Sequence, residues 1–193
     1  MAGTASAVLL LLGSAGAAEA RPAATPAAVS AAAPAYATWI ADVTAVATPA
    51  TDYLTQRLAV PGGRTAIVLD IDNTSLETHY SGGLTTPAVK PVLALAKLAK
   101  AKGAAVFFVS DRTEVIRWPT EGNLKAVGYP VNGLYLRPLF NFDPVQTNKT
   151  KARIAIEQAG YAIVANIGNN VTDLDGGHAE RTFKLPDYNG ALS

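Results

Sequence analysis

The fold of this 193-residue chain is decided by the stretch Ile67-Val68-Leu69-Asp70-Ile71-Asp72-Asn73-Thr74. It begins with large apolar residues typical of a buried strand and continues with two carboxylates and a hydroxyl residue. Because successive side chains of a strand point to opposite faces, Asp70 and Asp72 lie on the same face where the strand ends. Two neighbouring carboxylates at a strand end can share a metal ion, or divide the roles of nucleophile and general acid.

Several other kinds of site are excluded by the sequence. The chain has no cysteine, and its two histidines, His79 and His178, are far apart, which argues against thiol chemistry and a multi-histidine metal centre. A net charge of +1 gives no signal for nucleic acid or for an anionic membrane surface. A calcium-binding EF-hand loop starting at Asp70 would need glycine and glutamate at positions where this chain has Ser75 and Ser81.

The first 34 residues are expected to precede the folded domain. Residues 7–18 form an apolar run, AVLLLLGSAGAA, which is shorter than the about 20 residues that span a bilayer as a helix. No Lys or Arg precedes the run, but Ala18-Glu19-Ala20 fits a small-x-small cleavage site, so residues 1–20 are expected to form a signal peptide cleaved after about Ala20. We therefore expect a secreted or cell-surface protein with no stable membrane span. Residues 21–34 are then a disordered leader, and residues 35–193 are the domain.

From residue 35 onward, the apolar periodicity alternates between that of helices and that of strands. Residues 35–59 have helical spacing that is interrupted near Pro49, and they form an N-terminal helical extension. Apolar runs that are separated by helices predict a parallel sheet covered on both faces, in a Rossmann-like three-layer α/β/α sandwich with a mostly parallel sheet. The strands are expected at 66–70, 104–110, 134–137, 161–167 and 181–185, and the other helices at 87–102, 119–127 and 148–159.

Polar residues gather where these strands end, and ligands of such sheets bind beyond the carboxyl ends of the strands. The pattern provides a candidate nucleophile, a second carboxylate, a hydroxyl, a cation and further oxygen ligands, which is a set suited to phosphoryl transfer. The candidate residues are Asp70 and Asp72 after the first strand, Ser110 and Arg112 after the second, Lys149 before the fourth, and Asn169 and Asp173 after it.

Four motifs resemble those of the haloacid dehalogenase (HAD) superfamily of phosphatases, and they occur in the expected order at the predicted ends of elements. A later stretch, Arg181-Thr182-Phe183-Lys184-Leu185-Pro186, is similar to the plant acid phosphatase and vegetative storage protein subgroup, which is related to class B acid phosphatases. The four motifs are Leu69-Asp70-Ile71-Asp72-Asn73-Thr74, Val109-Ser110-Asp111-Arg112, Asn148-Lys149-Thr150-Lys151-Ala152-Arg153 and Gly168-Asn169-Asn170-Val171-Thr172-Asp173-Leu174.

The resemblance implies a role for each catalytic position. Asp70 attacks phosphorus and becomes an aspartyl phosphate, and Asp72 protonates the leaving group and then activates water. The Ser110 hydroxyl binds the transferring phosphoryl group. Lys149 offsets the negative charge of nucleophile and phosphate; Lys151 is a competing candidate for this role, although the spacing to Arg153 favours Lys149.

The resemblance also implies a magnesium ion, held by Asp70, the main-chain carbonyl of Asp72 and an acidic residue of the fourth motif. Here the chain departs from the family, because Asn169 stands where the family usually has aspartate. An amide oxygen can bind Mg²⁺ but brings no charge, so weaker binding is expected. Asp173 is expected either to replace the missing ligand or to lie just behind it.

The segments between the motifs are too short for a large cap domain, so the site is expected to be open, with only residues 75–86, residues 138–147 and the N-terminal helices over it. An open site discriminates leaving groups poorly, which predicts broad specificity toward small-molecule phosphate esters. Arg112 and Tyr80 are candidate substrate contacts. Further aromatic residues that could stack on a leaving group are Trp118, Phe140 and Phe142.

Two other functions compete with that of an exported, Mg²⁺-assisted acid phosphatase. The first is a non-catalytic phosphate-ester-binding or storage protein on the same fold, which Asn169 favours and the presence of Asp70 disfavours. The second is a receiver-type signalling domain, which also uses Asp, Ser or Thr, and Lys at strand ends. The expected export, and the placement of both aspartates on the first strand, disfavour this second alternative.

Overall fold

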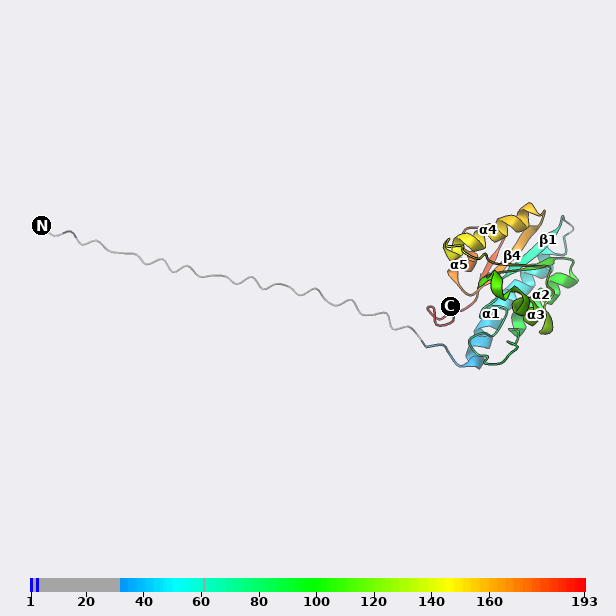
Figure 1. Ribbon diagram of the computed structural model, residues 1–193, viewed down its shortest axis with the longest axis horizontal. Coiled ribbons are helices and arrows are strands. Elements are labelled where there is room, and N and C mark those ends of the chain that lie inside the picture. Colours follow the sequence, from blue (N-terminus) through cyan, green and yellow to red (C-terminus); the bar gives the residue numbers. More distant parts are fainter. Residues whose placement is uncertain (2, 4–31, 61) are drawn as a thin grey trace.

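The computed structural model describes residues 1, 3, 32–60 and 62–193. The predicted signal peptide and most of the predicted leader therefore lie outside the described residues. From residue 36 the chain folds into helices and strands in the alternating order that the sequence predicts (Figure 1). Among the helices that the structure describes, none is long and apolar enough to cross a membrane.

The centre of the fold is a five-stranded sheet in which every strand pair is parallel. Its first strand in the chain is its middle strand in space, so the residues that follow this strand emerge at the centre of the sheet edge. The predicted α/β fold with a parallel sheet is confirmed. In spatial order the strands are β3 (Gly133–Arg137), β2 (Ala105–Thr113), β1 (Thr65–Leu69), β4 (Ala162–Gly168) and β5 (Thr182–Lys184).

Helices cover both faces of the sheet (Figure 1). On β1, Ile67 and Leu69 belong to a large core with three helices on one face, and Ala66 and Val68 to a smaller core with α4 on the other. Only one helix follows β1 before β2 begins, which leaves no room for a large cap domain there. The helices are α1 (Tyr36–Arg57), α2 (Lys90–Ala101) and α3 (Arg117–Ala126) with the short η1 (Glu114–Ile116) before it, then α4 (Val145–Gln158) and α5 (Val171–Leu174).

Helix α1 runs without interruption through Pro49, so the predicted break in this helix is wrong. A proline inside a helix removes one hydrogen bond and costs about 3 kcal/mol. Here the cost is offset by burial, because Pro49 is exposed while the opposite stripe of the helix packs into the large core. The stripe consists of Trp39, Val43, Ala47, Ala50 and Leu54, all of them buried. The predicted N-terminal extension is thus part of the core of the domain.

Strand β2 is longer than predicted, because it continues through Ser110 to Thr113. Its register with β3 shifts between Val109 and Thr113, which is a bulge. Bulges change the direction of side chains next to binding sites. The bulge contains the second motif, so Ser110 and Arg112 lie within an irregular strand end and not in a separate loop.

We predict that Leu54→Ala lowers the free energy of unfolding by about 2–5 kcal/mol, since the leucine is fully buried and its loss leaves a cavity. Urea unfolding of the purified protein would measure this. The matched control is Thr48→Ala on the exposed side of the same helix, which should change the free energy by no more than about 0.5 kcal/mol. Equal small effects of both variants would show that α1 does not belong to the core.

Candidate active site

A cavity of about 520 Å³ opens at the carboxyl edge of the sheet. Asp70 and Asp72 reach it from the end of β1, Ser110 from β2, and Lys149 from the first turns of α4. The predicted covering segments 75–86 and 138–147 each contribute one lining residue, Thr78 and Val145. The structure therefore brings together most of the predicted site residues, namely Asp70, Asp72, Ser110, Lys149, Asn169 and Asp173.

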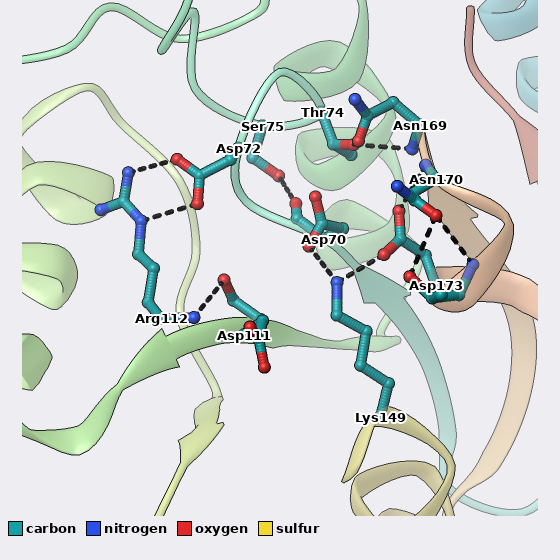
Figure 2. A network of polar contacts seen from close by, with 12 residues as sticks. Asp70, Asp72, Thr74, Ser75, Asp111, Arg112, Lys149, Asn169, Asn170 and Asp173 are labelled. Carbon is teal, nitrogen blue, oxygen red and sulfur yellow. Dashed lines mark hydrogen bonds and ion pairs between the residues drawn. The ribbon is translucent and has the colours of Figure 1, made fainter. Parts of the chain in front are cut away.

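The floor of the cavity holds a buried cluster of one cation and two carboxylates (Figure 2). The Lys149 ammonium donates to Asp70 Oδ1 at 2.7 Å and also to Asp173 Oδ1. Burial lowers the pKa of Lys149, but the two carboxylates raise it above its ordinary value, so the lysine stays charged. Burial raises the pKa of Asp70 to about 7, against the opposing effect of Lys149. The competing Lys151 instead pairs with Asp143 at 2.7 Å on the surface.

Asp72 points away from this cluster toward Arg112 (Figure 2). The guanidinium donates to both carboxylate oxygens at 2.9 and 2.7 Å, and the Thr78 hydroxyl adds a third bond at 2.8 Å. Burial raises the pKa of Asp72, yet these donors together bring it below its ordinary value. Arg112 itself is not among the residues that line the cavity. In the structure Arg112 therefore holds Asp72, and its predicted contact with the substrate stays a prediction.

Tyr80 is likewise not among the residues that line the cavity, and its predicted contact with the substrate stays a prediction. Its ring stacks on Trp39 of α1 with the centroids 4.7 Å apart, and its hydroxyl donates to the Pro34 carbonyl at 2.8 Å. The other aromatic candidates are strongly exposed and do not line the cavity either; these are Trp118, Phe140 and Phe142.

Gly168 allows the carboxylate of the fourth motif to reach the cluster. A Cβ at this position would overlap the Asp173 side chain. Asp173 belongs to the first turn of α5, where its Oδ2 accepts from the Asn170 main-chain N–H at 2.7 Å and the Asn170 side chain caps the helix in return. This reciprocal capping box leaves Asp173 Oδ1 for Lys149.

Arg153 is a supporting residue whose role was not predicted from the sequence. It is fully buried and donates to three main-chain carbonyls of the segment after β4, which belong to Asp173, Asp175 and Gly177. It therefore fixes the segment that carries Asp173. The only signal in the sequence was its position four residues after Lys149, which places both side chains on the same side of α4.

The oxygen donors at the site are of the type that Mg²⁺ prefers. Asp70 and Asp173 offer carboxylates, Asn169 an amide oxygen and Asp72 its main-chain carbonyl, and Mg²⁺ usually takes only one or two carboxylates and retains several waters. Within residues 32–60 and 62–193, however, no three His, Cys, Asp or Glu side chains cluster as metal ligands. The donor types fit the ion, and their small number of charges is consistent with weak binding.

Comparison with known proteins gives one family match and several relatives. Residues 81–191 match the family described as HAD superfamily, subfamily IIIB (acid phosphatase). The chain is 35% identical over 122 residues to the stem 28 kDa glycoprotein of Glycine max, covering 60% of this chain and 47% of that protein. It is 32% identical over 120 residues to vegetative storage protein 1 of Arabidopsis thaliana, covering 60% and 44%. The chain thus spans less than half the length of these relatives.

Among solved structures, the class C acid phosphatase from Bacillus anthracis has a similar fold. The TM-score is 0.63, and the match covers 81% of this chain and 83% of that chain. Because the two sequences are only 20% identical, this likeness concerns the fold alone.

We predict that Gly168→Ala destabilises the protein by about 1–3 kcal/mol, since the added methyl must displace Asp173 and the start of α5. The matched control is Gly122→Ala, where nothing lies within 4 Å of the new Cβ and a helical alanine should stabilise by up to about 1 kcal/mol. Urea unfolding of the two variants would compare them. A neutral Gly168→Ala variant would mean that Asp173 is not held where the structure places it.

Proposed function

Because the chain belongs to subfamily IIIB of the HAD superfamily, the acid phosphatases, we propose that it is an exported hydrolase of small phosphomonoesters. The observation that carries this proposal is the buried cluster in which Lys149 holds Asp70 beneath an open cavity. A carboxylate fixed beside an ammonium group can attack an anionic phosphate, because the cation offsets the charge of both partners. Export rests on the sequence of residues 1–20 alone.

The proposed reaction has two steps. An Asp70 oxygen forms a bond to phosphorus while the bond from phosphorus to the leaving oxygen breaks, and Asp72 gives that oxygen a proton. A water that loses its proton to Asp72 then attacks phosphorus, which releases phosphate and restores Asp70. Ser110 lines the cavity, and in this proposal its hydroxyl binds the phosphoryl oxygens. Mg²⁺ bound by Asp70, the Asp72 carbonyl and Asn169 or Asp173 would supply further positive charge against the phosphate.

Arg112 has a positioning role in this proposal. Its two bonds to Asp72 fix the carboxylate at the side of the cavity away from Lys149, and its third branch donates to Thr120 at 3.2 Å. A planar guanidinium fork can hold both carboxylate oxygens at once, whereas a lysine ammonium cannot. Arg112 thereby sets the orientation of the group that is proposed to handle the proton.

Broad specificity is the expected consequence of the open site. The connections after β1 and β2 carry only single helices and a short turn, so no domain inserted there covers the cavity in the part of the chain that the structure describes. With few contacts to the leaving group, most of the recognition would fall on the phosphoryl group itself. We therefore propose a general phosphomonoesterase whose substrates are small esters of different classes.

A storage or phosphate-ester-binding protein remains the second candidate, and it is favoured by the similarity to a protein named vegetative storage protein 1. In this case the cavity would hold a phosphate ester without cleaving it. The uncharged Asn169 in the fourth motif is compatible with such a role, because it weakens the proposed metal site.

We predict that the wild-type protein hydrolyses p-nitrophenyl phosphate and that Asp70→Asn lowers kcat by at least about a thousandfold, because the nucleophile is lost. Release of nitrophenol between pH 4 and 8, with and without Mg²⁺, would measure this. Asp143→Asn is the matched control, since it removes an exposed aspartate outside the cavity and should leave kcat unchanged. A folded wild-type protein that binds the ester but does not cleave it would favour the storage function.

We also predict that Arg112→Lys lowers kcat by about 10- to 100-fold and leaves KM nearly unchanged, because Asp72 loses its two-point support. Arg117→Lys is the matched control, because Arg117 makes the same forked contact with Glu114 outside the cavity. Steady-state kinetics would measure kcat and KM of both variants. A raised KM with normal kcat would show instead that Arg112 binds the substrate directly.

A further inference from the structure

The segment that follows β5 returns to the active site. Leu192 is buried in the large core, and Leu192 and Ser193 both line the catalytic cavity beside Asn169 and Asn170. We call residues 187–193 the wall segment, and its end, Leu192 and Ser193, forms part of one side of the cavity. No motif of the sequence analysis includes them.

Two asparagines, one from the first motif and one from the fourth, hold the wall segment through the same atom, the main-chain carbonyl oxygen of Leu192. The Leu192 carbonyl accepts from Asn73 Nδ2 at 2.9 Å and from Asn169 Nδ2 at 2.7 Å. The other atom of each carboxamide is also engaged, because Asn73 Oδ1 accepts from the His79 main-chain N–H at 2.7 Å and Asn169 Oδ1 accepts from the Thr74 hydroxyl at 3.1 Å. All three residues of this clamp, Asn73, Asn169 and Leu192, are buried.

We propose that Asn169 is a positioning residue that fastens the wall segment across the cavity, and that the fastened wall limits the size of the phosphate ester that can enter. The limit on size rests on the proposed phosphatase function, whereas the fastening itself does not. Asn169 therefore holds the wall of the cavity in place, in addition to binding Mg²⁺ or instead of it.

The clamp gives a physical reason for asparagine at this position. An aspartate would present two acceptor oxygens and no N–H to the Leu192 carbonyl, which is itself an acceptor. A buried carbonyl that loses one of its donors and gains a neighbouring negative charge is destabilised. An aspartate at position 169 would thus weaken the hold on the wall segment, which Asn73 would still contact.

The wall segment has further anchors, so loss of one clamp bond should loosen it without unfolding the domain. The Tyr188 hydroxyl donates to Asp42 of α1 at 2.6 Å. Lys184 lies 3.4 Å from Asp187, and the Leu192 side chain is buried against the core. Tyr188→Phe therefore offers a second way to loosen the segment, from its other end and without a new charge in the cavity.

The first arm of the test is hydrogen exchange of the wall-segment amides, measured by mass spectrometry. We expect Asn169→Asp to accelerate exchange by about tenfold or more in this segment and not in the β1 peptide, since a lost buried hydrogen bond is worth about that factor. Tyr188→Phe should accelerate the same amides. Asn141→Asp, in the loop before α4, is the matched control and should leave their exchange unchanged. Unchanged exchange in Asn169→Asp would overturn the proposal that Asn169 fastens the wall segment.

The second arm compares kcat/KM for a nucleoside monophosphate with that for p-nitrophenyl phosphate. Asn169→Asp or Tyr188→Phe should loosen the wall segment. Either variant should then raise the kcat/KM for the nucleoside monophosphate, relative to that for p-nitrophenyl phosphate, by about threefold or more. An unchanged ratio despite faster exchange would overturn the size limit. If the wild-type protein has no phosphatase activity, the proposed function fails. The hydrogen-exchange measurement still tests whether Asn169 fastens the wall segment.

A third readout, Mg²⁺ titration calorimetry, separates the clamp from a simple ligand role. If Asn169 were only a weak metal ligand, Asn169→Asp would bind Mg²⁺ at least about tenfold more tightly with no change in exchange, and the proposal would be wrong. Faster exchange of the wall segment in both variants, whatever the Mg²⁺ affinity, would support it.

Discussion

The buried ammonium of Lys149 is the constraint on which the rest of the site depends. A charge taken out of water must be matched by opposite charge at close range, and removing one partner of such a pair costs about 3–5 kcal/mol. Asp70 comes from the end of β1 and Asp173 from α5, so the three charges tie α4 to the end of β1 and to α5. The relative position of these elements is therefore set by electrostatics as well as by apolar packing, and supporting contacts such as those of Arg153 preserve it.

Much of the fold and part of the site could be predicted from the sequence because they depend on local pattern. The apolar runs around Ile67 and Phe107 are buried on both faces, which specifies central parallel strands. Parallel strands end at the same edge, so residues after different strands meet there, as Asp70, Ser110 and Asp173 do. For these positions the local pattern and the three-dimensional arrangement agree.

The parts that could not be predicted depend on partners that are distant in the sequence. The ring of Tyr80 stacks on Trp39, a packing contact that no periodicity reveals. The contact of Arg112 with Asp72 joins the irregular end of β2 to the segment after β1, which no local pattern reveals. The uninterrupted helix at Pro49 has the same origin, since tertiary burial outweighs the local cost of proline.

The charged cluster also bears on the choice between enzyme and storage protein. Replacing a buried ion pair by well-packed apolar residues is often neutral or stabilising, so burial of Lys149, Asp70 and Asp173 brings little advantage in stability. A protein that served only as a reserve of amino acids would need neither a carboxylate beneath the cavity nor a cation beside it, and one that only held a phosphate ester in the cavity would need the cation but not the carboxylate. A nucleophilic carboxylate that must meet an anionic ester needs both. The arrangement at the end of β1 is thus explained by reactivity better than by stability.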